Sequence, residues 1–217
     1  MQDGELFRSM TCDFCGGKKL KRIRKGEYVC EYCGSRFLYT ADDDTDDEQV
    51  QARLMAIFAQ AEEYEENGDL ENELQTLTKG LETAPDNCTL MLKIGRAYRK
   101  LGEPKTAYEY YKKAEQLDPN DPVVYNNLGS LYLTQECYDE ARSYMEKCMR
   151  MIEADPLSAS IDEIAVIYNN YALSVGMAGD KDRARKYLKQ AKEKGCAERH
   201  LSYTCGKLGF RLKEILK

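Results

Sequence analysis

The chain has 217 residues, of which 32% are charged and 42% hydrophobic, and its formal net charge at pH 7 is −6. This length accommodates one medium domain or two unequal ones, and no apolar run approaches the roughly 18 residues that a membrane-spanning helix needs. The N-terminal sequence lacks a basic segment followed by an apolar core, so we expect no secretory signal and a cytoplasmic protein.

Charge is unevenly distributed along the chain. Residues 1–41 carry eight Lys/Arg and five Asp/Glu, whereas residues 42–48 hold six acidic residues and one threonine. Residues 49–217 then hold 24 Lys/Arg and 27 Asp/Glu. The pattern predicts a basic domain over 1–41, an acidic linker over 42–50 and a mildly acidic domain over 51–217.

Four of the nine cysteines have a spacing typical of a structural zinc site. Two residues separate Cys12 from Cys15 and Cys30 from Cys33, and 14 residues separate the two pairs. A two-residue gap lets both thiolates of a pair reach one ion, and two pairs supply the four soft ligands of a tetrahedral Zn²⁺ site. We therefore predict one structural zinc ion bound by these four cysteines. A redox dithiol normally accompanies a βαβ pattern, which this segment lacks, and iron–sulfur proteins use other spacings.

Short strands are expected around the cysteines, over residues 19–24, 28–30 and 36–39. A segment of this size with few large apolar side chains cannot bury enough surface to fold alone, and structural zinc contributes about 10–16 kcal/mol. Residues 10–40 resemble the zinc ribbons of transcription proteins and rubredoxin-like proteins, which implies a small β domain folded around the metal.

From residue 54 onward the sequence is self-similar. Small residues recur at Ala61, Gly95, Gly129 and Ala172, at intervals of 34, 34 and 43 residues. Expected turns within each helical hairpin fall at Gly68, Gly102, Glu136 and Gly179.

This pattern resembles the tetratricopeptide repeat over about three quarters of the chain. The second copy fits the family's pattern best, at Gly95, Tyr98, Gly102, Ala107, Tyr111, Ala114 and Pro119. In the first copy, Glu73 and Gly80 replace the usual alanines. The resemblance implies a mainly α, right-handed solenoid of about four helical hairpins. Small residues would let large partners such as Tyr98, Leu101 and Tyr111 approach closely, and each hairpin would cover the apolar face of the next.

Two irregularities qualify the repeat. The long third interval is expected to lengthen two helices, with a capping box at Ser160 and Glu163 starting the second of them. After residue 197, one final capping helix is expected to bury a stripe formed by Leu201, Cys205, Leu208, Leu212 and Ile215.

In the resembled family, the first helices of successive repeats line a concave groove that binds peptides. Position by position, the groove is expected to present Lys93, Arg96, Arg99, Asn126, Asn127, Ser130, Asn169, Asn170 and Leu173. Asparagine amides offer a donor and an acceptor each, which suits a peptide backbone, although Asn127 and Asn170 also match the ordinary repeat pattern. Some relatives bind a chaperone's carboxylate with a Lys/Asn/Arg clamp. That clamp is lacking here, because its positions hold Phe58, Glu62, Leu92, Val123 and Val166.

The remaining residues show no catalytic pattern. Cys148 and Cys205 are expected to be buried, and the single histidine, His200, has no matching ligands. There is no glycine-rich phosphate loop and no Ser/His/Asp set, and four thiolates would close the zinc shell to water.

The sequence therefore predicts a non-catalytic adaptor that binds a protein or peptide in the repeat groove and uses the zinc ribbon as a second interaction module. The alternative is a nucleic-acid-associated protein that uses the basic run of the ribbon. Stacking on Tyr28 and Phe37 would assist it, whereas the adjacent acidic run would repel phosphate. The run comprises Lys18, Lys19, Lys21, Arg22, Arg24 and Lys25.

Overall fold

The computed structural model describes residues 20–24, 27–30, 36–38 and 43–216. The chain divides into two compact units, Met1–Ala56 and Ile57–Lys217. Among the described residues, no helix combines the length and the apolar character that crossing a membrane requires.

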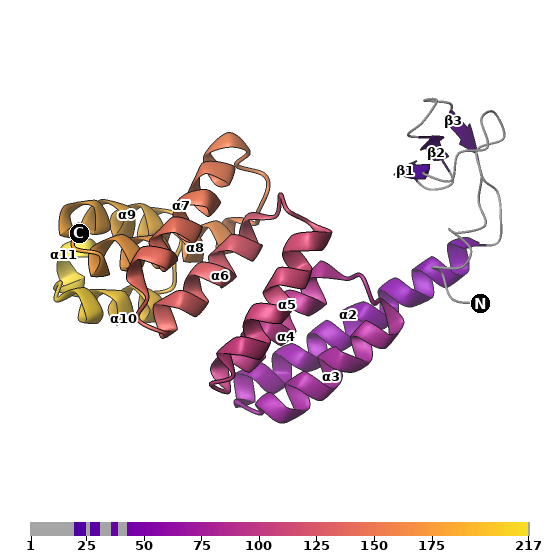
Figure 1. Ribbon diagram of the computed structural model, residues 1–217, viewed down its shortest axis with the longest axis horizontal. Coiled ribbons are helices and arrows are strands. Elements are labelled where there is room, and N and C mark those ends of the chain that lie inside the picture. The colour runs from indigo at the N-terminus through magenta and orange to yellow at the C-terminus, as the bar shows by residue number, and fades with distance from the viewer. Residues whose placement is uncertain (1–19, 25–26, 31–35, 39–42, 217) are drawn as a thin grey trace. The chain divides into compact units, whose positions relative to one another are not determined.

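The N-terminal unit contains a three-stranded antiparallel sheet in the order β1-β2-β3 (Figure 1). Its strands are β1 (Leu20–Arg24), β2 (Glu27–Cys30) and β3 (Arg36–Leu38), each within one residue of the expected span. Of the four predicted zinc ligands, Cys12, Cys15 and Cys33 lie outside the described residues, and only the backbone of Cys30, at the end of β2, is described. The zinc site therefore stays a prediction.

Helix α2 (Asp43–Asn67) begins in the acidic run and continues beyond the boundary between the units. The linker expected over 42–50 is thus helical from residue 43, and the expected domain start at residue 51 lies inside one continuous helix.

The C-terminal unit is a helical solenoid. The residues of α2 from Ile57 onward are followed by α3 (Leu70–Thr83), α4 (Cys88–Lys100), α5 (Pro104–Leu117), α6 (Pro122–Thr134), α7 (Tyr138–Ala154), α8 (Ile161–Met177), α9 (Lys181–Glu193), α10 (Glu198–Leu208) and α11 (Leu212–Leu216). The most extensive packing pairs α4 with α5, α6 with α7, and α8 with α9 (Figure 1). Further contacts join α3 to α4, α5 to α6, and α7 to α8, so each hairpin covers the next.

Close approach within the hairpins depends on the small residues. A Cβ atom at Gly95 would lie 2.5 Å from the ring of Tyr111, and one at Gly129 would lie 2.8 Å from the side chain of Met145. Both large side chains are fully buried. The expected contribution of Tyr111 is confirmed, whereas Leu101 is 43% exposed at the end of α4.

The turns within the hairpins follow the predicted positions. Gly68, Gly102 and Gly179 have φ values of 73°, 79° and 104°, which lie in the left-handed region where glycine is favoured. Glu136 occupies the equivalent place in the third hairpin with φ of 60°. The repeat geometry therefore imposes a positive φ on Glu136, although residues that carry a Cβ atom favour negative φ.

The long third interval extends helices, as the sequence predicts. Both α7 and α8 have 17 residues, whereas α4, α5 and α6 have 13 or 14. Helix α8 begins with the expected capping box, because the Ser160 hydroxyl accepts from the Glu163 backbone N–H while the Glu163 carboxylate accepts from the Ser160 N–H.

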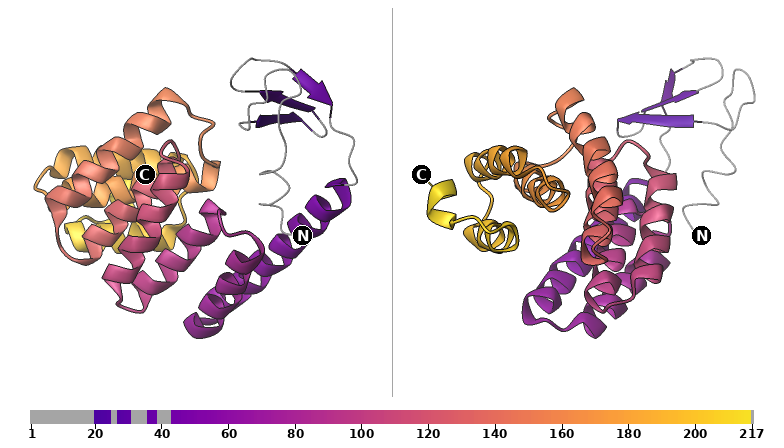
Figure 2. Two further views of the ribbon diagram at one scale, coloured as in Figure 1. Left: turned by 45° about the vertical axis from the view of Figure 1, so that its right-hand side comes forward. Right: turned by 60° about the vertical axis from the view of Figure 1, so that its left-hand side comes forward.

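The prediction of one uninterrupted capping helix is wrong. Gly209, with φ of 73°, ends α10, and the N–H of Phe210 donates to the carbonyl of Cys205 over 2.8 Å. This bond spans five residues and terminates the helix in a Schellman motif. The short helix α11 follows and packs against α9, while α10 packs against α8 and α9 (Figure 2). Four residues of the expected stripe are nevertheless buried: Leu201, Cys205, Leu208 and Ile215.

One polar side chain departs from this packing scheme. Glu73 replaces a small residue of the repeat pattern in α3 and is only 1% exposed. Its Oε2 has no hydrogen-bond partner in the described part of the chain. Burial raises the pKa of Glu73, and the nearby Glu65 carboxylate adds to this effect, against the opposing charges of Lys100 and Arg96.

We predict that Gly95→Ala destabilises the solenoid by about 1–3 kcal/mol, because the added Cβ atom would lie 2.5 Å from the fully buried ring of Tyr111. Gly129→Ala should cost less, since the unbranched Met145 side chain can adopt another rotamer. The control is Gly206→Ala in α10, where a Cβ atom meets nothing within 4 Å, and which should stabilise by up to about 1 kcal/mol. Urea unfolding of each variant measures these differences, and equal effects at Gly95 and Gly206 would contradict the packing described.

We also predict that Glu73→Gln changes how stability depends on pH. A carboxyl group whose pKa is higher in the folded state contributes stability below its unfolded pKa, near 4.5, and loses it as pH rises through the folded pKa. Wild type should therefore lose stability relative to Glu73→Gln between pH 4 and pH 7, with a difference of about 1–2 kcal/mol at neutral pH. Glu82→Gln, at an exposed position of the same helix, serves as the control. Parallel stability–pH curves for wild type and Glu73→Gln would show this account of Glu73 to be wrong.

Candidate functional site

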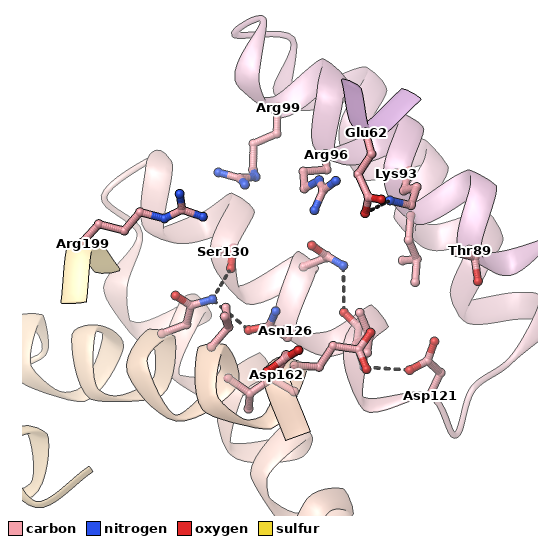
Figure 3. Close-up of a pocket in the computed structure, with 17 residues that line it drawn as sticks. Glu62, Thr89, Lys93, Arg96, Arg99, Asp121, Asn126, Ser130, Asp162 and Arg199 are labelled. Carbon is pink, nitrogen blue, oxygen red and sulfur yellow. Dashed lines mark hydrogen bonds and ion pairs between the residues drawn. The ribbon is translucent and has the colours of Figure 1, made fainter. Parts of the chain in front are cut away.

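A groove open to solvent, with a volume of about 630 Å³, lies along the first helices of the hairpins (Figure 3). Its walls come from α4, α6 and α8, with Glu62 of α2 and Arg199 of α10 at its margins. The solenoid brings these helices side by side, because α4, α6 and α8 belong to successive hairpins that pack on one another.

Seven of the nine residues expected to face this groove line it: Lys93, Arg96, Arg99, Asn126, Asn127, Ser130 and Asn170. The other two lie elsewhere. Asn169 is 4% exposed and Leu173 packs against the hydrophobic core. Successive residues of a helix point about 100° apart, so Asn170 can face the groove while its neighbour Asn169 is directed into the packed interior.

The α4 wall is basic, and part of its charge is neutralised. Lys93 Nζ lies 3.8 Å from a Glu62 carboxylate oxygen, Arg96 pairs with Glu65, and Lys100 pairs with the same carboxylate at 2.7 Å. Burial alone would raise the pKa of Glu65, but the hydrogen bond from Lys100 and the charges of Arg96 and Lys100 bring it below its usual value. Since these side chains are partly exposed, each pair contributes at most about 1 kcal/mol to stability.

The middle of the groove presents amide and hydroxyl groups. Asn170 Nδ2 of α8 donates to Asn126 Oδ1 over 3.0 Å and to Ser130 Oγ over 3.3 Å, which links α8 to α6. Asn127 Nδ2 donates to the Val123 carbonyl of its own helix over 3.0 Å. Within the described part of the chain, the amide nitrogen of Asn126 and the amide oxygen of Asn127 make no hydrogen bond and can pair with a ligand.

The side formed by the starts of α6 and α8 is acidic. Asp121 caps α6 by accepting from the Val123 N–H over 2.8 Å, and Glu163 belongs to the α8 capping box beside Asp162. Burial raises the pKa of Asp121, the Val123 hydrogen bond opposes this rise, and the Asp118 and Glu163 charges increase it. Two of these three carboxylates therefore already serve the helix ends.

Apolar residues complete the lining. Leu92, Val123, Val166 and the buried Ile167 line the groove between the charged sides. Leu92, Val123 and Val166, together with Glu62, stand at the positions where the sequence indicated that a carboxylate clamp is lacking. Phe58, at the fifth of these positions, lies beneath Lys93, whose Nζ is 5.8 Å from the ring centroid.

Sequence reasoning missed several lining residues. Arg199 comes from α10, outside the repeats, so no repeat position could indicate it. Asp121, Asp162 and Glu163 lie at helix starts; the sequence predicted the capping box that contains Glu163, but not that these three residues line the groove.

The remaining cysteines and the histidine are not gathered into a site. Cys148 and Cys205 are buried as predicted, and burial raises the pKa of Cys148 to about 12. His200 is half-buried in the first turn of α10, where burial and the Arg199 charge lower its pKa. Among the described residues, no three His, Cys, Asp or Glu side chains are placed to hold a metal ion.

Comparison with known proteins agrees with this architecture. A tetratricopeptide repeat family model matches residues 121–193, and a second TPR repeat model matches residues 95–136. The chain is similar to the "Protein CTR9 homolog" of Arabidopsis thaliana, with 34% identity over 86 residues that make up 37% of this chain and 8% of that protein. Its matches to curated relatives thus span only a small part of their length.

Among solved structures, PilF of Pseudomonas aeruginosa has a similar fold, with a TM-score of 0.59 and 21% identity over 73% of this chain and 70% of PilF. The APC/C hetero-tetramer Cut9-Hcn1 gives a TM-score of 0.57 and 14% identity, over 72% of this chain and 34% of the matched chain. At these identities the likeness concerns the fold alone. Together with the hairpins and small residues described above, the family matches show that this chain contains tetratricopeptide repeats, matched over residues 95–193.

Proposed function

We propose that the protein is a non-catalytic cytoplasmic adaptor whose groove binds an extended segment of a partner protein. The observation that carries this proposal is the pair of unbonded groups in one open groove, the amide nitrogen of Asn126 and the amide oxygen of Asn127, placed between charged sides and apolar residues.

The chemistry of the groove suits a peptide. Amide donors and acceptors pair with a peptide backbone whatever its sequence, and apolar patches at Leu92, Val123 and Val166 accommodate alternate side chains. Its volume of about 630 Å³ is also in the range of about 300–1,000 Å³ that is usual for ligand sites. One structural neighbour of similar fold, Cut9-Hcn1, forms a hetero-tetramer, so a chain of this fold takes part in a protein assembly there.

The N-terminal segment supplies the second part of the proposal. The paired spacing of Cys12, Cys15, Cys30 and Cys33 supports one structural Zn²⁺ ion that folds a ribbon around the strands. This ribbon would contact a second partner, so the chain would join two proteins.

We predict that a bulky side chain placed in the groove prevents partner proteins from binding. Ser130→Trp places an indole in the groove, whereas the matched control Ser143→Trp places it at an exposed position of α7 that does not line the groove. Affinity purification of the full chain with quantitative mass spectrometry should recover the same set of proteins with wild type and with Ser143→Trp. The amount of these proteins should be at least tenfold lower with Ser130→Trp. Circular dichroism would first establish that both variants fold. Equal recovery with both variants would contradict groove binding.

We predict one zinc ion per chain by elemental analysis of protein purified without added metal. Cys30→Ser should abolish stoichiometric zinc, while Cys137→Ser, at a half-buried free cysteine of the solenoid, should retain it. Zinc content that is unaffected by Cys30→Ser, or protein that contains no zinc, would rule out the proposed ribbon site.

A further inference from the structure

Two arginines of the groove have no ionic partner. Within the described residues, neither Arg99 of α4 nor Arg199 of α10 forms an ion pair, although both line the groove. Their side chains extend toward one another on the side of the groove where Ser130 lies (Figure 3). One comes from a repeat and the other from a helix outside the repeats, so the site exists only in the folded solenoid.

This placement contrasts with the other charges of the groove. Lys93 and Arg96 pair with glutamates of α2, and Asp121 and Glu163 are held by the helix starts that they cap. Among the residues that the structure describes, Arg99 and Arg199 are thus the cations of the groove whose charge is left uncompensated. Two guanidinium groups directed at a common space repel each other unless an anion lies between them.

Arg99 is also held in place. Its Nε is enclosed and has no hydrogen-bond partner in the described part of the chain. Burial raises the pKa of the Tyr111 hydroxyl, and the Arg99 charge close to it opposes that rise. The enclosed Nε limits the orientations open to the Arg99 side chain, so less conformational entropy is lost when its guanidinium binds a ligand.

A third donor lies nearby. Ser130 Oγ accepts a hydrogen bond from Asn170 over 3.3 Å, which leaves its own O–H free to donate. An oxyanion between the arginines could accept from both guanidinium groups and from this hydroxyl. Carboxylates and phosphates match the planar fork of arginine, and such charge-assisted bonds are about twice as strong as neutral ones.

We propose that Arg99, Arg199 and Ser130 form an oxyanion pocket that selects peptides carrying an acidic or phosphorylated side chain. This inference rests on the proposed function and specifies the charge that the bound segment carries. The pocket differs from the carboxylate clamp that the sequence lacks, because it uses a helix beyond the repeats.

An oriented peptide library tests the proposal, because it requires no identified partner. The full chain would be incubated with octapeptides in which one central position is fixed and the others are degenerate. The fixed residue would be Asp, Glu, Asn, Gln, Ser or phosphoserine. We expect enrichment of Asp and Glu over Asn and Gln, or of phosphoserine over Ser, by about tenfold, and this enrichment should fall steeply with salt. The acidic and phosphorylated arms identify which oxyanion is preferred.

The preference should fall at least fivefold in Arg99→Gln and in Arg199→Gln, and persist in Arg150→Gln, an exposed arginine of α7 that does not line the groove. Arg199 is exposed, so its variant keeps the test valid should Arg99→Gln impair folding. Binding without preference for charge, or a preference unchanged in both groove variants, overturns the oxyanion pocket and leaves the peptide groove intact. Binding of no peptide by wild type contradicts the groove function and the pocket with it.

Discussion

The structure depends on one packing constraint: no helical hairpin of this solenoid can cover its own apolar face. Gly95 and Gly129 lack a side chain where Tyr111 and Met145 pack, and this closeness lets each hairpin present a continuous face to the next. Because stacking is compulsory, the first helices become neighbours and α4, α6 and α8 form a shared surface. The groove is therefore a consequence of how the core is buried.

That surface is polar because several of its side chains cap helix starts or link one helix to the next. Asp121 and Glu163 satisfy helix starts, and Asn170 connects α8 to α6 through Asn126 and Ser130. Once these groups are paired, a few amides, Asp162 and two arginines of the described solenoid remain for a ligand. The acidic and basic residues of the groove are similar in number. The electrostatic character of the groove is therefore determined by which of these charges are already paired.

The solenoid could be predicted from the sequence because its determinants are local and periodic. Glycines at the hairpin turns, a capping box at Ser160 and small residues at fixed intervals each specify backbone geometry directly. Seven of the nine expected groove residues line the groove because the same register places them there. The missed features depend on three-dimensional placement or on a single backbone angle. Arg199 reaches the groove only through the packing of α10, and Gly209 divides an apolar stripe whose spacing reads as one helix. The buried Glu73 likewise occupies a position where the periodic pattern predicts only a small residue.

Site-specific photocrosslinking most directly tests the central claim that the concave side of the solenoid binds a partner. A photoreactive amino acid would replace Asn127, which lines the groove, or Ser143, which is exposed on α7 and does not line it, in the full chain within its native cells. The account predicts discrete, reproducible adducts at position 127 whose peptides map to one segment of the partner, and none at 143. Adducts of equal yield at both positions, or at 143 alone, would contradict it.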